Sequence, residues 1–337
     1  MNNAKPPTVA EEYESLFHYT NYQGLEGIIE SQTLWATHYR YLNDAEELIH
    51  AKTILHRIVS PKVKEFIEKG ILSSGDHAKF VEFSGGVEKV AQDESQKLID
   101  RFYSALLLDS QGYDSGLPGP FILAFCAAKD SFVKRNGLLS QWRGYGVDGG
   151  YLIEFDSKQI ENLIKNEIQS FYYPVGVFAD VGYGEKLDDT PIDFKADVLE
   201  LEEKIFRFIN FFDQVGEQED FPNEILMLFV KLISRSKHVG FKEENEIRAV
   251  FFPGSNQHRV NETKPEIKQR QIKLLKFKSF GGTPRPYIEL FELNKKLPIK
   301  RIIVGPHRDK ELRKKSLGLK LKNLGIEVRS SSIPYLG

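Results

Sequence analysis

The sequence predicts an α+β fold: a single mixed-sheet domain over residues 1–337, with helical insertions at about 45–118 and 186–238. Short segments with the alternating polarity of strands are interspersed with segments of helical periodicity. The chain shows no internal repeat, which excludes solenoid folds, and no Pro/Ser-rich linker that would divide it. A basic strand–helix–strand unit at about 299–331 predicts a parallel crossover near the end of the chain.

The first part of the chain predicts strand, helix, strand and helix in that order. Residues 16–20 (LFHYT) and 33–39 (TLWATHY) have the composition and alternation of strands, with a helical segment between them. Asn43 and Asp44 are suitable caps for the next helix. Pro61 is expected to end that helix, because proline lacks the backbone N–H that a helix interior requires.

The remaining elements follow from the same periodicities. In chain order, they are helices over 63–108, a strand at 121–126, a short helix at 138–143, a strand at 151–155, a helix and a strand before 181, helices at 193–212 and 223–233, a strand at 246–252, weaker strands near 271–278 and 287–291, and the final strand, helix and strand at 301–305, 309–323 and 326–330.

The composition indicates a folded protein with a substantial core. Of its 337 residues, 41% are hydrophobic and 12% aromatic, which excludes intrinsic disorder. No apolar run approaches the ~20 residues of a membrane span, and residues 1–10 lack the features of a signal peptide. We therefore expect a cytoplasmic protein that does not bind membranes. The single cysteine, Cys126, lies in an apolar run and is predicted to belong to the core.

Charge is unevenly distributed along the chain, although the 46 basic and 48 acidic residues leave a net charge of only −2. Residues 180–224 contain 14 acidic and 4 basic side chains, whereas residues 264–322 contain 18 basic and 5 acidic ones. Two interpretations stay open. These segments form solvated faces that keep the protein soluble, or the basic segment 264–322 binds an anionic partner such as nucleic acid.

A first group of candidate functional residues lies at the end of the first predicted strand. His18, Tyr19 and Thr20 are consecutive, and strand alternation places His18 and Thr20 on one face. An imidazole and a hydroxyl on one face are suited to binding a ribose hydroxyl. The alternative is a buried histidine whose hydrogen bonds are made by the backbone.

A second group consists of Glu244 and Glu246, which lie two residues apart where a predicted strand begins. On a strand, this spacing would place both carboxylates on one face. Paired carboxylates can position a nucleophile and stabilise positive charge at a sugar C1. The alternative is an ion pair between one carboxylate and Arg248 or Lys242.

A third group, Trp142, Arg143 and Tyr145, lies on the predicted short helix before a glycine-rich turn. The aromatic rings are suited to stacking and the arginine to a phosphate, although this spacing is also typical of core packing. The turn at 144–149 satisfies GxGxxG, but it precedes a strand, whereas the dinucleotide fingerprint opens a helix. The sequence contains no nucleophile elbow, P-loop or zincin motif.

The order of these motifs resembles a bacterial family of domains of unknown function, over nearly the whole chain. The matching segments are LFHYT (16–20), TLWAT (33–37), NDAEE (43–47), the strand that ends in Cys126, SQWRGY (140–145), GYLIEF (150–155), VGY (181–183), ENEIR (244–248), IIVGP (302–306) and SSIPY (331–335). Ala45 stands where that family often has proline, and Phe241 where it often has tryptophan. This resemblance implies no activity.

A second resemblance does imply an activity. An early H-x-T on a strand, and a late glutamate that opens a strand, are similar to ADP-ribosyltransferases of the HYE type. The resemblance implies a split ADP-ribosyltransferase-like core with NAD as substrate. His18, together with Tyr19 and Thr20, would bind the adenosine-side ribose. Glu246 would hold the nicotinamide ribose while positive charge develops, and Glu244 would orient the acceptor.

In the same comparison, Trp142 or Tyr145 would stack on nicotinamide, and Arg143 would receive a phosphate. The expected function is therefore NAD-dependent ADP-ribosyl transfer to a nucleic acid or protein acceptor, by a bacterial toxin or phage-defence effector. The basic segment 264–322 would contact the acceptor.

Two other functions stay open. The first is a metal-dependent nuclease with Asp44, Glu46, Glu244 and Glu246 as oxygen ligands for Mg²⁺, although no dedicated metal motif is present. The second is a non-catalytic sensor that binds a nucleotide or a partner protein.

Overall fold

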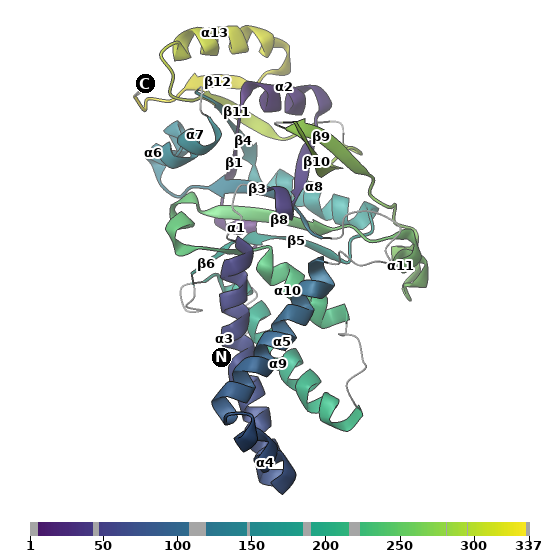
Figure 1. Cartoon of the computed structure of the whole chain (residues 1–337). Coiled ribbons are helices and arrows are strands. Elements are labelled where there is room, and N and C mark those ends of the chain that lie inside the picture. Colours follow the sequence, from purple (N-terminus) through teal and green to yellow (C-terminus); the bar gives the residue numbers. More distant parts are fainter. Residues whose placement is uncertain are drawn as a thin grey trace. The chain divides into compact units, whose positions relative to one another are not determined.

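The structure is a computed structural model, and it describes residues 6–42, 47–107, 119–146, 149–184, 190–215, 223–280, 282–294 and 296–334 (Figure 1). The chain divides into two compact units. Unit 1 comprises Met1–Tyr41, Phe121–Asp180 and Gly240–Gly337, and unit 2 comprises Leu42–Pro120 and Val181–Val239. The insertions predicted at 45–118 and 186–238 fall within the two segments of unit 2. Their insertion into a single domain stays a prediction.

Unit 1 contains a mixed sheet of ten strands, which confirms the predicted fold class. The strands are β1 (Ser15–Thr20), β2 (Leu34–His38), β3 (Phe121–Ala127), β4 (Tyr151–Asp156), β5 (Val175–Asp180), β8 (Glu246–Phe252), β9 (Leu275–Phe280), β10 (Thr283–Leu290), β11 (Ile299–Val304) and β12 (Glu327–Ser330). All pairs are antiparallel except β11 with β12.

The sheet splits at β3. Along one edge, β3 pairs with β8 from Phe121 to Cys126. The opposite edge is shared by two strands: β1 pairs with the C-terminal end of β3, and β2 pairs with its N-terminal end. From this point, one branch of the sheet continues through β4 and β11 to β12, and the other continues through β10 to β9. Both branches therefore leave the same edge of one short strand.

Two apolar clusters cover opposite faces of the β1–β4–β11 branch. The larger cluster includes Leu16 and Ile153 and is covered by side chains of α2 (Tyr22–Ser31), α8 (Ser157–Ser170) and α13 (Lys310–Lys320). The smaller cluster contains Phe17, Tyr19, Leu152 and Trp142, the last from α7 (Leu139–Tyr145). Neighbouring residues of β1 thus pack on opposite faces, as the strand alternation predicts.

The predicted C-terminal strand–helix–strand unit is confirmed. β11 and β12 are parallel neighbours, and α13 connects them. The other short helices of unit 1 are α1 (Val9–Glu12), η1 (Tyr39–Tyr41), α6 (Ser131–Asn136), η3 (Val239–Glu244, beginning at the last residue of unit 2), α11 (Asn256–Asn261), α12 (Pro265–Lys268) and η4 (Lys322–Leu324).

Unit 2 is mainly helical. Its elements are α3 (Glu47–Ser73), α4 (Gly75–Phe83), α5 (Val87–Leu107), α9 (Ile192–Val215), α10 (Asn223–Ile233) and a parallel pair formed by β6 (Gly182–Tyr183) and β7 (Ser236–Lys237). Its core contains a fully buried arginine, Arg235, which binds Asp193 at 2.5 Å and also forms an ion pair with Asp197. A buried arginine is stable only where such carboxylates compensate its charge.

The prediction that Pro61 ends a helix is wrong, because α3 continues through Pro61 to Ser73. Buried apolar residues lie on both sides of the proline, among them Ile58, Val59 and Val63. Burial of this continuous apolar face within unit 2 stabilises the helix by more than it loses through the one hydrogen bond that proline cannot donate. The predicted caps Asn43 and Asp44 lie outside the described residues. In the part of the chain that is described, no helix is long and apolar enough to span a membrane.

Candidate functional site

His18 lies where β1 leaves β3. Its Nδ1 is 3.1 Å from the carbonyl oxygen of Ala124, in the middle of β3. A carbonyl only accepts hydrogen bonds, so Nδ1 carries the proton and Nε2 is left as an acceptor. Burial lowers the pKa of His18 below its usual 6.5, and this effect outweighs the opposing effect of the bond to Ala124. The neutral imidazole can therefore accept a hydrogen bond from a hydroxyl such as that of a ribose.

This lowered pKa predicts acid-sensitive stability of unit 1. As the pH falls below 6.5, the unfolded chain binds a proton that the folded imidazole resists, so the free energy of unfolding decreases. The decrease should not exceed about 1.4 kcal/mol per pH unit for this one group. Urea unfolding of His18→Gln should depend less on pH than that of the wild type. His258→Gln, at an exposed position of unit 1, is the control. Equal pH dependence in His18→Gln and the wild type would contradict this prediction.

Thr20 shares the His18 face of β1, as the sequence predicts. In the β1–β4 register, His18 lies opposite Ile153 and Thr20 opposite Tyr151, and both partners belong to the larger apolar cluster. Gly24 in α2 leaves room for this threonine, because a Cβ at Gly24 would lie 2.0 Å from the Thr20 hydroxyl oxygen. His18 and Thr20 are both only partly buried.

Tyr19 points to the opposite face and packs against Trp142, with the rings edge to face and their centroids 5.0 Å apart. The Tyr19 hydroxyl accepts a hydrogen bond from the Leu138 amide at 2.7 Å, and the Trp142 indole donates to the Asn136 carbonyl at 2.9 Å. Both side chains are buried. The structure thus assigns Trp142 to the core and leaves it no open ring face for nicotinamide.

The other two candidates on α7 are on the surface. Tyr145 is 44% exposed, and Arg143 is also exposed. If a ring of this helix stacks on a ligand, the exposed side chain of Tyr145 is the one available. Trp142 packs against Tyr19 of β1, whereas Tyr145 is the last residue of the helix.

Glu246 opens β8 and is buried, with 5% of its surface exposed. Its Oε1 accepts a hydrogen bond from Nε of Arg248 at 2.6 Å, and its Oε2 lies 3.4 Å from Nη2 of the same side chain. The ion pair with Arg248 that the sequence left as an alternative is therefore present, and it is buried. The carboxylate is held in a fixed orientation by this pair.

The expectation that Glu244 and Glu246 share a face of one strand is wrong. Glu244 is the last residue of η3, and Asn245 adopts a left-handed conformation with φ of 44° before the strand begins. Strand alternation does not extend across such a turn. Asn245 instead binds the end of β3, through its backbone carbonyl and its side chain, to the amide and carbonyl of Ala127.

His18 and Glu246, separated by 228 positions in the sequence, approach β3 from opposite edges. His18 binds the carbonyl of Ala124, and Glu246 is the register partner of Cys126. Phe17 also pairs with Cys126, so Phe17, Cys126 and Glu246 form one row that spans about 10 Å, two strand spacings. Register partners share a face, and His18, one residue further, points to the other.

Of the four carboxylates expected to bind Mg²⁺ in a nuclease, the structure describes Glu244 and Glu246. Asp44 and Glu46 lie outside the described residues. Among the residues that are described, no three His, Cys, Asp or Glu side chains are grouped as they would be around a metal ion. Glu246 is engaged by Arg248, as shown above.

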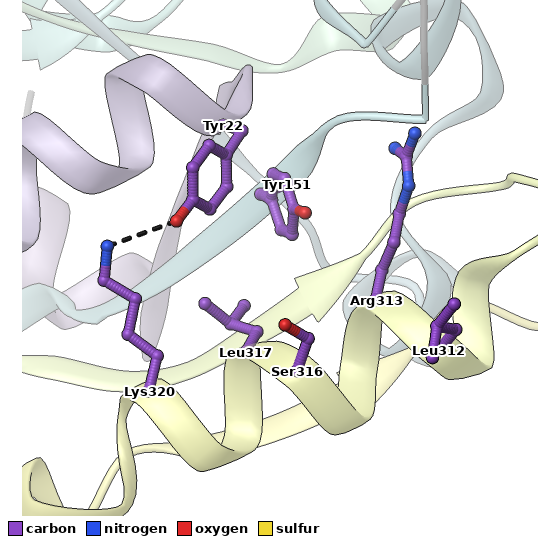
Figure 2. Close-up of a pocket in the computed structure, with 7 residues that line it drawn as sticks. All are labelled: Tyr22, Tyr151, Leu312, Arg313, Ser316, Leu317 and Lys320. Atoms are coloured by element: carbon purple, nitrogen blue, oxygen red, sulfur yellow. Dashed lines mark hydrogen bonds between the residues drawn. The ribbon is translucent and has the colours of Figure 1, made fainter.

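A pocket of about 280 Å³ lies on the face of the sheet that carries His18 and Thr20 (Figure 2). It is formed by α2, β4 and α13 and is lined by Tyr22, Tyr151, Leu312, Arg313, Ser316, Leu317 and Lys320. None of these seven residues was predicted as a site residue. The available signals were a tyrosine two positions after the HYT motif and two cations seven residues apart on a predicted helix.

Unit 1 is thus a split mixed-sheet domain with histidine and glutamate side chains on either side of the central strand β3. Residues 141–249 match the model of a family described as "Protein of unknown function (DUF2971)". The predicted resemblance to a domain-of-unknown-function family is confirmed for this segment, which is roughly a third of the chain and not nearly all of it. The segment includes Trp142, Tyr145, Glu244 and Glu246, whereas His18 lies outside it. No curated protein and no solved structure matches the chain.

Proposed function

We propose that unit 1 catalyses NAD-dependent ADP-ribosyl transfer to a nucleic acid or protein acceptor. The supporting observation is the position of His18 and Glu246, which contact or pair with residues of β3 only two positions apart, where the sheet splits. A dinucleotide is long enough to contact side chains that lie about two strand spacings apart. Because the two side chains point to opposite faces, the substrate would have to cross the split edge of β3.

The residues then have separate roles. The free Nε2 of His18 accepts a hydrogen bond from a ribose hydroxyl of NAD and orients it. The Glu246 carboxylate, positioned by Arg248, stabilises the positive charge that develops at C1′ of the nicotinamide ribose. The bond from C1′ to nicotinamide breaks, and both of its electrons leave with neutral nicotinamide. The acceptor nucleophile bonds to C1′ and loses its proton to Glu244, which is partly exposed and passes the proton to water.

As the acceptor, a nucleic acid is favoured by the basic segment 264–322, which lies entirely within unit 1. A protein acceptor is the alternative. The sequence-based expectations of a cytoplasmic location and of a role as a toxin or phage-defence effector belong to this proposal, because NAD and nucleic acids are abundant in that compartment.

Nicotinamide release from NAD by the purified chain tests the proposal. The reaction is followed with and without added RNA, DNA or cell lysate. We expect His18→Gln and Glu246→Gln each to lower the rate by about 10²-fold or more, because each removes a group that contacts the substrate or its developing charge. The addition that raises the wild-type rate identifies the acceptor class.

The controls carry the same chemical changes at exposed positions of unit 1. His258→Gln and Glu327→Gln should release nicotinamide at the wild-type rate. Because Glu246→Gln weakens a buried ion pair, its folding is checked by tryptophan fluorescence, to which both tryptophans, Trp35 and Trp142, contribute from unit 1. Absence of release by folded wild-type protein under every condition, or release that both site variants retain, would contradict the transferase proposal.

The burial of Glu246 favours a second candidate function. A carboxylate that is 5% exposed and paired with a buried arginine is also suited to a purely structural role. The chain would then be a non-catalytic sensor that binds a nucleotide or a partner. This function predicts NAD binding without nicotinamide release, and binding that Glu246→Gln leaves unchanged. Nucleic acid cleavage that chelation abolishes and Mg²⁺ restores would instead indicate the nuclease.

A further inference from the structure

The geometry points to a binding surface on one face of the β2–β10–β9 branch of the sheet, which we propose binds single-stranded nucleic acid through two stacked aromatic rings and a lysine. β10 lies between β2 and β9, and each pair is antiparallel (Figure 1). The use of this surface to bind an acceptor rests on the proposed function. Binding itself requires neither NAD nor transfer.

Alternation along the three strands separates an apolar face from an open face. Ala36 and Ile288 are register partners, and both belong to the larger apolar cluster. Their neighbours Trp35 and Tyr287 therefore lie on the opposite face, where both are only partly buried. Lys276 is the register partner of Tyr287 and extends this face onto β9. The larger side chains of the open face are Trp35, Lys276, Lys278, Arg285, Tyr287 and Glu289.

Trp35 and Tyr287 form the aromatic part of the open face. Their ring centroids lie 4.4 Å apart and their planes are tilted by only 31°, which is close to an offset stack. The rings hold each other in place and stay partly exposed, so a further flat ring can extend the stack. Every base offers such a ring, whatever its identity. In a duplex, neighbouring bases cover these ring faces, which is why we specify a single strand.

Lys278 places a positive charge beside the two rings. Its Nζ lies 4.3 Å from the centroid of the Trp35 ring, and no carboxylate among the residues that the structure describes forms an ion pair with it. The side chain is exposed. At an exposed position, a contact between an ammonium and a ring is weaker than a charge-assisted hydrogen bond to phosphate. Lys278 can therefore exchange the ring for a phosphate while a base stacks on the aromatic pair.

The other charged groups of the open face are already engaged. Glu289 forms an ion pair with Lys276 and accepts a hydrogen bond from the Thr33 hydroxyl at 2.9 Å, and the contact with Glu289 raises the pKa of Lys276. Arg285 donates to the carbonyl of Tyr41 at 3.4 Å. We therefore assign the phosphate contact to Lys278 alone. Stacked rings beside a cation match the alternation of base and phosphate along a single strand, which an acidic peptide lacks.

Fluorescence polarisation of labelled oligo(U) and oligo(dT) of about ten nucleotides, with the full chain and without NAD, tests this inference. We expect both strands to bind more tightly than a duplex of the same length, and the tighter of the two shows whether RNA or DNA is preferred. Trp35→Ala and Tyr287→Ala should each weaken the affinity by about fivefold or more through lost stacking. Tyr287→Phe keeps the ring and should bind within about threefold of the wild type.

The salt dependence of binding tests Lys278 separately from the rings. Lys278→Gln should weaken binding and lower the slope of log affinity against log salt concentration by about 0.7, the contribution of one phosphate contact on a single strand. A substitution that only disturbed the sheet would not change this slope in proportion to one charge. Because Lys278 is exposed, this variant also keeps the inference testable if an aromatic variant fails to fold.

The matched controls make the same kinds of change away from the open face. Phe277→Ala removes a 57% exposed ring on the opposite face of β9, where Phe277 pairs with Pro286. Lys158→Gln removes an exposed lysine of α8 in unit 1. Both should bind oligonucleotides with the affinity and salt slope of the wild type.

Three outcomes would overturn the inference. They are the absence of single-strand binding at protein concentrations up to about 10⁻⁴ M, the weak limit of non-specific nucleic acid binding, a wild-type salt slope in Lys278→Gln, or wild-type affinity in folded Trp35→Ala and Tyr287→Ala. The first outcome would leave a protein as the occupant of the open face. Nicotinamide release without strand binding would overturn this inference alone, whereas strand binding without release would contradict only the transferase proposal.

Discussion

Replacing Glu167 by alanine is expected to lower the free energy of unfolding of unit 1 by about 3–5 kcal/mol, the usual effect of breaking a buried ion pair. Glu167 in α8 and Lys273 have side chains that are each 1% exposed, and they bind at 2.7 Å. The oxygen bound by Lys273, Oε1 of Glu167, also accepts a hydrogen bond from the Tyr173 hydroxyl at 2.8 Å, and Oε2 accepts one from the Phe291 amide at 2.9 Å. One carboxylate therefore satisfies three buried donors.

The loss is large because the three donors stay buried after the substitution. Among the residues that the structure describes, Lys273 would keep Glu292, 3.2 Å away and partly exposed, and the ring of Phe171, whose centroid lies 3.7 Å from Nζ. Phe291 has a positive φ of 68°, which a non-glycine residue adopts only where its surroundings hold it. Its backbone amide would lose the hydrogen bond to Glu167.

A double-mutant cycle separates the ion pair from the other contacts. The double variant Glu167→Leu/Lys273→Met is expected to be less destabilised than the sum of its single variants, by about 1–3 kcal/mol, because it leaves no unpaired charge. Urea unfolding followed by tryptophan fluorescence measures unit 1, since both tryptophans lie there. Glu327→Ala, in a pair that is half exposed, should change stability by no more than about 0.5 kcal/mol. Additive effects at Glu167 and Lys273 would contradict this account.

Replacing Trp142 by alanine is expected to destabilise unit 1 by about 3–5 kcal/mol, because it removes a large buried side chain. Trp142 is 4% exposed, packs against Tyr19 and donates to the Asn136 carbonyl. The indole also fills space that two glycines leave, since a Cβ at Gly137 or Gly305 would lie within 2.6 or 2.7 Å of its atoms. Trp142→Phe should lower the free energy of unfolding by less, about 1–2 kcal/mol, because it keeps most of the packing and loses only the hydrogen bond of the indole N–H.

This measurement also decides between two roles for the short helix α7. If Trp142 stacked on nicotinamide, Trp142→Ala would lower NAD affinity and leave the free energy of unfolding nearly unchanged. The structure predicts the opposite. Tyr145→Ala, at a 44% exposed position of the same helix, is the control and should lower the free energy of unfolding by about 1 kcal/mol or less. Trp35 serves as the fluorescent probe in the Trp142 variants.

Local periodicity was sufficient to predict most elements of this chain. Strands were found at 15–20, 34–38, 121–127 and 246–252, close to the predicted ranges, because an alternating or continuous apolar run bounded by polar residues favours a strand in many different folds. The error at Pro61 shows the limit of this approach. Proline disfavours a helix interior locally, but a buried apolar face on both sides of it kept α3 continuous.

The sequence was sufficient to identify candidate residues for the site, but it did not predict how most of their side chains are arranged. His18 and Thr20 share a face, as alternation requires. Glu244 and Glu246 do not, because Asn245 turns the backbone between them. Whether Trp142 or Tyr145 faces solvent depended on which side of α7 packs on the sheet, and a seven-residue helix contains too little pattern to decide this.

The sequence by itself determined the mixed α/β character, the C-terminal strand–helix–strand unit and the candidate histidine and glutamates, because these depend on residues close together in the chain. Only the tertiary structure decided that β1 and β2 share one edge of β3, that Glu246 is paired and buried, and that Tyr22, Tyr151 and Arg313 line one pocket. Strands compete for the same backbone donors and acceptors, and their pairing is settled by the packing of the whole sheet.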